Sequence, residues 1–297
     1  MEFLSILAID IGGTSIKYAL WAAEALTEKG SFVTPVTWEQ MKMDLKATLH
    51  NLTSCSQTPI EAVSISVPGA VDSDQGIIGG YSAIPYIHKI HFVAELEELL
   101  EKPVFVENDA NCAGLAEAFY GAAKDAKSSV SFIIGSGIGG AVVLERKLVK
   151  GHNLFGGEFG YMLAENGQTL SELASPVHAA KRYCEQKGLV SGITGRELFD
   201  IADTGDQLAQ QEVQQLFRAL AIGIYNVCLV IDPEVVCIGG GISMRKDLLA
   251  PVKAQLCLLQ QQHHSEDQRI TVKICQFQQD ANLIGAVANY HLRKEQV

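Results

Sequence analysis

The chain has 297 residues, of which 47% are hydrophobic and 19% charged, a composition that excludes a mainly disordered or fibrous protein. This length is close to the size at which one hydrophobic core divides, so we expect two compact lobes. The 23 Lys and Arg residues against 34 Asp and Glu give a net charge of −11, which repels a phosphate backbone and argues against nucleic-acid binding.

The first half of the chain alternates predicted strands and helices. Strands are expected where apolar residues alternate with a period of two, and helices where they recur every three or four positions. In chain order we expect two strands within residues 4–20, then a loop and a helix over 38–52. A strand over 62–67, a helix over 92–100, a strand over 103–106 and a helix from 107 on are expected to follow. Glycine or proline marks the ends of the early strands, at Gly12, Gly13, Pro68 and Gly69.

The second half begins with a polar stretch, residues 121–129, and then repeats the opening pattern. Two apolar strands around a glycine-rich turn are predicted in residues 130–144. A capping box at Thr194 and Glu197 predicts a helix start, a long helix is expected over residues 208–231, and a final strand over 235–238. The recurrence of the hairpin predicts two topologically similar lobes that face each other.

The cysteines and the apolar segments indicate the compartment. Seven cysteines are widely spaced and include no C-x-C or C-x-x-C pair, which is typical of reduced cytoplasmic thiols. The chain start lacks the basic region of a secretory signal, and Asp10 interrupts its apolar run. Residues 219–231 form an apolar stretch too short for a bilayer and predict the end of a buried helix. We therefore expect a cytoplasmic protein without a membrane segment.

Three glycine clusters each follow an apolar strand, at residues 12–13, 135–140 and 239–241. Glycine lets the backbone approach a ligand and expose N–H groups to an anion, although a tight hairpin turn is the alternative for each cluster alone. Residues 135–140 also match the dinucleotide fingerprint G-x-G-x-x-G, but residues 141–144 predict a strand where that fingerprint opens a helix. The sequence therefore favours phosphate held by hairpin loops over a dinucleotide-dependent dehydrogenase.

Three charged residues are candidates for the chemistry of a phosphate site. A carboxylate next to a phosphate loop predicts a divalent cation between them, so Asp10 is either a magnesium residue or a turn cap. Lys17, in the second strand, either neutralises phosphate oxygens or is a solvated surface lysine. Asp109 lies between a strand and a helix, where it is either a helix cap or the general base of phosphoryl transfer to an alcohol.

Together these motifs resemble the ROK family of bacterial repressors, open reading frames and sugar kinases, which has the actin and hexokinase-like ATPase fold. Seven motifs match in order along nearly the whole chain: Asp10-Ile11-Gly12-Gly13-Thr14 with Lys17, Val67-Pro68-Gly69, Glu107-Asn108-Asp109-Ala110-Asn111, the loop at residues 135–140, Gly157-Glu158-Phe159-Gly160-Tyr161, Asp232-Pro233-Glu234 with Gly239-Gly240-Gly241, and Gly285-Ala286. The resemblance implies an α/β fold of two actin-like (ribonuclease H-like) lobes, each a mixed sheet flanked by helices. The lobes would comprise residues 1–115 plus 285–297 and residues 116–284, with the active site in the cleft between them.

The resemblance also implies ATP, Mg²⁺ and a sugar acceptor, with Asp109 as the catalytic base. The expected nucleotide-binding residues are Asp10, Gly12, Gly13, Thr14, Lys17, Gly135, Ser136, Gly137, Gly139 and Gly140 for the phosphates, and Gly240 and Gly241 for adenosine. Asp10 would hold the magnesium ion through water. The expected sugar-contacting residues are Gly69, Asn108, Asp109, Glu158, Tyr161 and Glu172. An alignment on Ala174 and Ser175 would place Ser171 at the position of Glu172.

Two departures from the family pattern concern the metal and the sugar. Many members have a histidine followed by a cysteine-rich zinc motif where this chain has Tyr161 and no cysteine in residues 162–169, so no zinc is expected. Ala83 stands where many members have a sugar-binding asparagine, so one hydrogen bond to the sugar is expected to be missing. The zinc-free motif and residues 193–199 look most like Gram-positive β-glucoside kinases.

The resemblance therefore implies an ATP-dependent kinase that phosphorylates a hexose or a β-glucoside, with the 6-hydroxyl as the expected acceptor. Because the first hairpin starts by residue 4, we expect no helix-turn-helix of the repressor branch. A homodimer is expected from the resemblance only. The alternative is a catalytically idle sugar-binding sensor of the same family, and ATP consumption in the presence of a sugar distinguishes the two.

Overall fold

The computed structural model describes residues 4–56 and 58–295, which divide into two compact units. Unit 1 contains the described residues up to Phe119, the segment Lys150–Phe155 and the described residues from Gln279 on. Unit 2 contains Tyr120–Val149 and Gly156–Gln278. The chain thus enters unit 1 a second time at Lys150 before it returns to unit 2.

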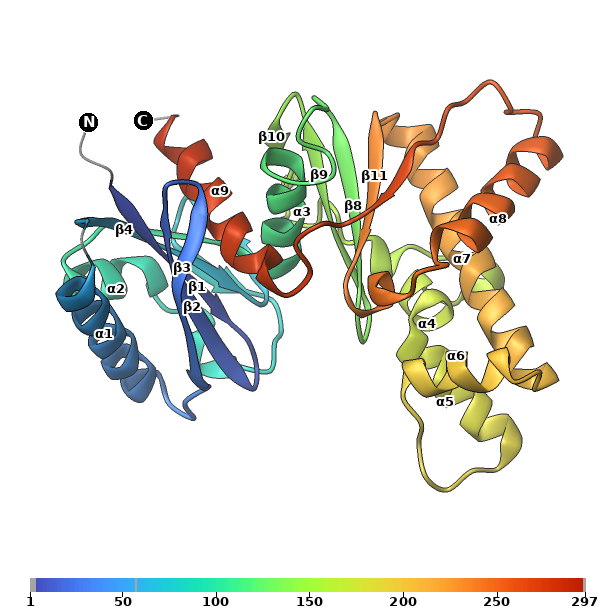
Figure 1. Cartoon of the computed structure of the whole chain (residues 1–297), viewed down its shortest axis with the longest axis horizontal. Coiled ribbons are helices and arrows are strands. Elements are labelled where there is room, and N and C mark those ends of the chain that lie inside the picture. Colours follow the sequence, from blue (N-terminus) through green and yellow to red (C-terminus); the bar gives the residue numbers. More distant parts are fainter. Residues whose placement is uncertain (1–3, 57, 296–297) are drawn as a thin grey trace. The chain divides into compact units, whose positions relative to one another are not determined.

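Unit 1 is built on a five-stranded mixed sheet with the order β3-β2-β1-β4-β7 (Figure 1). The neighbours β1, β2 and β3 run antiparallel, whereas β1, β4 and β7 run parallel. In chain order the elements are β1 (Ser5–Ile11), β2 (Ser15–Ala22), β3 (Ala25–Val33), α1 (Trp38–Cys55), β4 (Ile60–Val67), β5 (Ala70–Asp72), β6 (Ile77–Gly79), α2 (Phe92–Leu100), β7 (Val104–Asn108), α3 (Asp109–Phe119) and α9 (Ala281–Lys294).

Alternation along β1 explains how the two faces of this sheet are covered. Successive side chains of a strand point to opposite faces. Leu7 and Ile9 are buried in a core that includes Met41 of α1 and Phe92 of α2. On the other face Asp10 accepts a hydrogen bond from Asn282 of α9. Helices α1 and α2 therefore cover one face, and α9, which packs along α3, covers the other (Figure 1).

Unit 2 repeats this topology in a five-stranded sheet with the order β10-β9-β8-β11-β12. Again three strands are joined by antiparallel pairing, and two further strands run parallel to the first. The elements are β8 (Ser129–Ile134), β9 (Ile138–Leu144), β10 (Lys147–Leu148), α4 (Leu170–Ala174), α5 (Pro176–Lys187), α6 (Gly195–Asp203), α7 (Gln207–Ile231), β11 (Val235–Gly239), α8 (Leu249–Gln262) and β12 (Val272–Ile274). The predicted fold class of two similar mixed sheets flanked by helices is confirmed.

The core of unit 2 forms between β8 and the long helix α7. Phe132 and Ile134 of β8 are buried together with Leu216, Leu220 and Ile224 of α7. Within the described residues, α7 is the helix long and apolar enough to cross a membrane by length and composition, a test that core helices of soluble proteins also pass. Its buried face agrees with the prediction of a buried helix at the end of this segment.

Two strands of the structure, β3 and β12, are not predicted from the sequence. The sequence predicts a loop before the first helix, but β3 lies there as the edge strand of its sheet, with alternate residues exposed. Its hairpin turn is formed by Ala23 and Glu24, both with positive φ, so the usual glycine or asparagine signal is missing. The strand at Val235 is also not the last one, because the three-residue β12 follows it.

Candidate functional site

The first glycine loop joins β1 to β2 at the edge of unit 1. The Gly12 amide donates to the Ser15 carbonyl oxygen at 3.0 Å, and the Thr34 hydroxyl donates to the Gly12 carbonyl oxygen at 2.5 Å. A Cβ atom on Gly13 would lie 2.9 Å from the Cβ atom of Ala83, so this close approach requires glycine. Gly13 and Thr14 are exposed, which leaves their backbone open to an anion.

Asp10 and Lys17 lie opposite each other at the start of this loop. They are register partners in the antiparallel β1–β2 pair, so their side chains share one face of the sheet. The Oδ1 atom of Asp10 accepts hydrogen bonds from the Ser66 hydroxyl at 3.0 Å and from the Asn282 amide at 2.9 Å. These two bonds orient the carboxylate. Neither Ser66 nor Asn282 is predicted from the sequence as a site residue.

Asn108 and Asp109 form the junction between β7 and α3. The backbone N–H of Asn111 donates to Asn108 Oδ1 at 3.1 Å, which is the hydrogen bond of a helix cap. The Asn108 amide donates to the Gly69 carbonyl oxygen at 2.9 Å and to Asp109 Oδ1 at 3.0 Å. The neighbouring Ala110 N–H also donates to Asp109 Oδ1, at 2.8 Å. Asn108 thus fills the capping role that the sequence leaves open for Asp109.

The surroundings of Asp109 change its acidity. Burial raises the pKa of the Asp109 carboxyl, and the nearby Asp10 carboxylate raises the pKa further. The hydrogen bonds from Ala110 and Asn108 stabilise the ionised form and oppose these effects only in part. A carboxylate with a raised pKa is a stronger proton acceptor, which is the property that a general base requires.

The buried side chain of Glu107 forms hydrogen bonds with residues at the junction of β7 and α3. Glu107 is 1% exposed, and its Oε1 atom accepts hydrogen bonds from the Asn108 N–H at 2.8 Å and from the Asn111 amide at 3.0 Å. Its Oε2 atom accepts from Ser73 at 2.9 Å and pairs with Lys150 at 2.8 Å. Lys150 neutralises a charge that would otherwise be buried alone. The sequence carries no signal for this partner, because Lys150 is far along the chain.

The backbone of Gly69 contacts Asn108 and so contributes to the site at Asn108 and Asp109. Its φ of +111° is a conformation that side chains rarely adopt, and an added Cβ atom would lie 2.8 Å from the Gly79 carbonyl oxygen. Glycine is therefore required where the chain turns from β4 into β5. This turn presents the Gly69 carbonyl oxygen to the Asn108 amide. The structure thus brings the predicted residues Gly69, Asn108 and Asp109 together.

The second glycine loop joins β8 to β9 in unit 2. The Ser175 hydroxyl lies between the carbonyl oxygens of Gly135, at 3.1 Å, and Ser136, at 2.8 Å. The Ile138 N–H donates to Ser171 Oγ at 3.0 Å. Because β9 follows the loop directly, the predicted hairpin is confirmed, and the helix of a dinucleotide fingerprint is not there. Gly137 lies in the same turn, whereas Gly139 belongs to β9 and pairs with Ile133 of β8.

The Glu158 motif packs against β9. A short 3₁₀ helix, Phe159–Tyr161, begins directly after Glu158. The Phe159 ring lies on Gly140, where a Cβ atom would be 2.4 Å from a ring carbon. Glu158 is partly buried, and Tyr161 is exposed. In the part of the chain that the structure describes, no three His, Cys, Asp or Glu side chains are grouped so that they could hold a metal ion.

Glu172 is held in a capping box at the start of α4. Its Oε2 atom accepts hydrogen bonds from the Thr169 N–H at 2.7 Å and the Thr169 hydroxyl at 2.9 Å. The Thr169 hydroxyl in turn accepts from the Glu172 N–H at 3.3 Å. Its neighbour Ser171 contacts the second glycine loop instead. The sequence leaves open whether Ser171 or Glu172 faces the sugar. Of these two residues, Ser171 is the one hydrogen-bonded to the second glycine loop.

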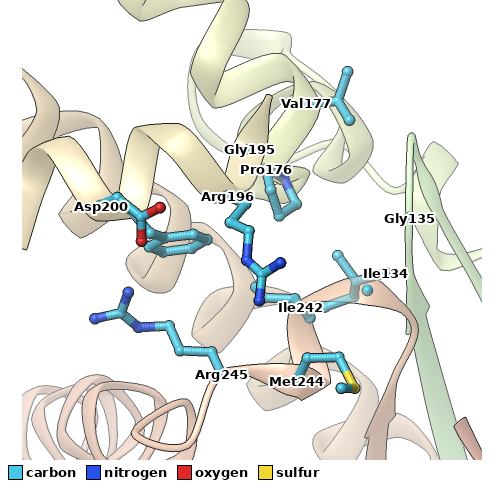
Figure 2. A pocket seen from close by; sticks show the side chains of 12 residues that line it. Ile134, Gly135, Pro176, Val177, Gly195, Arg196, Asp200, Ile242, Met244 and Arg245 are labelled. Atoms are coloured by element: carbon cyan, nitrogen blue, oxygen red, sulfur yellow. The ribbon is translucent and has the colours of Figure 1, made fainter. Parts of the chain in front are cut away.

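A pocket of about 540 Å³ opens in unit 2 beside the second and third glycine clusters (Figure 2). Gly240, with a φ of +80°, precedes Gly241 on the pocket wall, and a Cβ atom on Gly240 would lie 2.2 Å from the Ile134 carbonyl oxygen. The pocket is lined by Ile134, Gly135, Pro176, Val177, Gly195, Arg196, Phe199, Asp200, Gly241, Ile242, Met244 and Arg245. Its walls combine apolar side chains with a few charged groups, as small-molecule sites do.

Two arginines line this pocket in different ways. The guanidinium carbon of Arg245 lies 4.7 Å from the centre of the Phe199 ring, and its Nη2 atom pairs with Asp203 Oδ1 at 3.1 Å. Arg196 extends from the first turn of α6 toward Ile242 (Figure 2). The predicted capping box of Thr194 and Glu197 is confirmed, and it fixes the helix start that carries Arg196. The sequence marks this helix start but does not identify Arg196 as a pocket residue.

Among known proteins, the model of the ROK family matches residues 6–292 of this chain. A β-glucoside kinase of Listeria monocytogenes is 30% identical over 306 residues, which cover 99% of both chains. A ROK family protein from Streptococcus pneumoniae, solved in complex with sucrose, has a TM-score of 0.88 and 34% identity over 99% of this chain and 100% of its own. A ROK family glucokinase from Streptomyces griseus, in complex with glucose and AMPPNP, has a TM-score of 0.75 and 25% identity over 95% and 97% of the two chains.

Proposed function

Because the chain belongs to the ROK family and is a phosphotransferase with an alcohol acceptor, we propose that it transfers the γ-phosphoryl group of ATP to the 6-hydroxyl of a hexose or β-glucoside. One observation supports this proposal most directly. Asp109, a carboxylate with a raised pKa, is held by Asn108 in the same unit as Asp10 and the first glycine loop. Phosphoryl transfer to an alcohol needs such a base beside a phosphate site.

Asp109 takes the proton of the sugar hydroxyl in this proposal. Its Oδ1 atom already accepts hydrogen bonds from Asn108 and Ala110, so Oδ2 is the atom assigned to the hydroxyl. As the hydroxyl oxygen forms its bond to the γ-phosphorus, the bond from that phosphorus to the β-phosphate oxygen breaks and ADP leaves. Asn108 orients the carboxylate, and Glu107 with Lys150 orients Asn108.

The nucleotide is assigned to the glycine loops and to the pocket of unit 2. The backbone N–H groups of Gly13, Thr14, Ser136 and Gly137, together with Lys17, are assigned to phosphate oxygens. The N–H groups of Gly12, Gly135 and Ile138 donate within their own loops and support this arrangement. The adenosine occupies the pocket beside Gly240 and Gly241. Asp10 fits a magnesium ion, since its oriented carboxylate is a hard oxygen ligand beside an open loop. When bound, the ion would neutralise part of the phosphate charge.

The sugar and its surroundings complete the proposal. Gly69, Asn108, Glu158 and Tyr161 are the proposed sugar contacts. Glu172 stays a predicted contact, and its Oε2 atom is held in the capping box. We also place the enzyme in the cytoplasm as a homodimer, without zinc and without a nucleic-acid or membrane partner.

The direct test measures ADP release by the purified protein from ATP and Mg²⁺. The acceptors are free hexoses, N-acetylhexosamines and β-glucosides such as cellobiose and gentiobiose. We expect ADP to form in proportion to sugar phosphate with at least one hexose or β-glucoside. Sugar binding in calorimetry without ADP release from any acceptor would contradict the kinase and support the alternative of a sensor.

The pH dependence tests the role assigned to Asp109. The base must be ionised to accept a proton, so kcat/KM is expected to fall as the pH drops through the pKa of Asp109. Because burial raises this pKa, the acid limb should lie above the ordinary aspartate value of about 3.9. Initial rates between about pH 4 and 8 locate the limb. Circular dichroism at each pH controls for unfolding, and a kcat/KM that stays constant down to about pH 4 would contradict the assignment.

A further inference from the structure

The loop of residues 80–83 begins next to the Asn108–Asp109 junction. Strands β5 and β6 pair so that Ala70 lies opposite Gly79, and the loop starts directly after that pair. A Cβ atom on Gly80 would lie 3.3 Å from the Ala70 nitrogen. That nitrogen belongs to the same peptide group as the Gly69 carbonyl oxygen, which accepts the Asn108 amide hydrogen bond. Only one peptide group therefore separates Gly80 from this contact.

The other end of the loop contacts the phosphate loop. Ala83 lies against Gly13, where an added Cβ atom would be 2.9 Å from the Ala83 Cβ atom. In the proposed reaction the acceptor hydroxyl lies between Asp109 and the phosphate at residues 12–14. Residues 80–83 extend from one of these positions to the other, all within unit 1. They therefore border the acceptor site.

His88 keeps this loop in place. A carbonyl oxygen can only accept, so His88 Nδ1 donates to the Gly79 carbonyl oxygen at 3.0 Å. In the neutral ring, Nε2 then accepts from the Ser82 hydroxyl at 2.6 Å. Ser82 Oγ in turn accepts from the Ile84 N–H at 3.2 Å. The backbone is thus anchored on both sides of Tyr81.

Tyr81 itself is uncovered. Its exposed fraction is 95%, higher than that of the other exposed aromatic residues in the described chain, such as Tyr161 at 69% and Phe155 at 64%. An aromatic ring on an anchored loop offers a flat apolar face at little entropic cost. The C–H groups on one side of a pyranose ring match such a face. Ala83, two residues on, adds no side-chain hydrogen bond to the acceptor.

We infer that residues 80–83 form a second sugar subsite in which Tyr81 stacks on the ring beyond the phosphorylated one. The inference rests on the proposed function and narrows its substrate class to β-glucosides with a second ring, such as a β-linked disaccharide or an aryl β-glucoside. The phosphorylated glucose lies at Asn108 and Asp109, and its β-linked partner lies over Tyr81. A free hexose leaves the Tyr81 ring unused.

The test compares cellobiose with glucose in the variants Tyr81→Ala and Tyr81→Phe. Tyr81→Ala is expected to lower the ratio of kcat/KM for cellobiose to kcat/KM for glucose by about tenfold, because the stacking surface is lost. Tyr81→Phe keeps the ring and should keep the wild-type ratio. Val190→Ala, at a fully exposed position in unit 2, is the control for a surface truncation elsewhere.

Three results would overturn the subsite. They are an unchanged ratio in Tyr81→Ala, an equal fall of the ratio in Tyr81→Phe, and a wild-type protein that prefers glucose to cellobiose. In each case the protein still phosphorylates a sugar, so the proposed function survives. If no sugar is phosphorylated, the proposed function fails, and calorimetric titration of Tyr81→Ala with cellobiose still decides the subsite. Cellobiose affinity equal to that of the wild type would then exclude it.

Discussion

Replacing Asp109 by Asn is expected to lower kcat by about 10²–10⁴-fold, the usual contribution of a general base. The amide keeps the shape of the carboxyl group, and its oxygen still accepts the hydrogen bond that Ala110 donates to Asp109 Oδ1. What it loses is the ability to take the hydroxyl proton. Steady-state ADP release at saturating sugar measures the effect, and ATP titration by calorimetry shows that the nucleotide still binds.

The stability of this variant provides the control for its activity. Since burial raises the pKa of Asp109, the ionised carboxyl is disfavoured in the folded protein, and a neutral amide removes that cost. The thermal midpoint near neutral pH should therefore not fall. The matched control is Asp125→Asn, which changes an exposed aspartate of unit 2 and should keep wild-type turnover. Wild-type turnover in Asp109→Asn would remove Asp109 from the reaction.

Replacing Gly285 by Ala is expected to destabilise the protein by about 3 kcal/mol or more. Gly285 lies where α9 crosses α3, and a Cβ atom there would be 1.7 Å from the Cys112 carbonyl oxygen and 2.2 Å from its carbonyl carbon. Backbone atoms of a helix cannot move aside as a flexible side chain can. The two helices must therefore separate, and the contact of Asn282 with Asp10 is disturbed with them.

Urea unfolding followed by circular dichroism measures the loss in the free energy of unfolding. If Gly285→Ala does not fold, its soluble yield is compared with that of the wild type instead. Gly192→Ala is the matched control, since a Cβ atom at Gly192 meets nothing within 4 Å. We expect the control to unfold at the wild-type midpoint. A wild-type midpoint for Gly285→Ala would show that the crossing of α3 and α9 tolerates a side chain.

The features that the sequence predicts well are local. Strands that end in glycine loops, the capping box of Thr194 and Glu197 and the long apolar helix are all visible in neighbouring residues and are confirmed. Asn108 and Asp109 stand out for the same reason, because they separate a strand from a helix. Edge strand β3 is missed, since its exposed residues lack the apolar alternation that marks a buried strand.

The features that the sequence misses depend on residues far apart in the chain. Asn282 reaches Asp10, and Lys150 reaches Glu107, only because the fold brings their helices and loops together. The pocket residue Arg196 is placed in the same way. Glu172 is different, because Thr169 three residues earlier repeats the Thr194–Glu197 pattern. That local signal predicts a capping role for Glu172 from sequence alone.

The position of α9 also sets the order in which the protein can be completed during synthesis. The ribosome makes β1, β4 and β7 early, but the helix that covers them is made after β12. Until α9 emerges, the Ser64 hydroxyl lacks the Ala286 carbonyl oxygen to which it donates at 2.6 Å in the folded chain. Unit 2 has all of its strands by then. The unit whose strands are made first is thus the last to be finished.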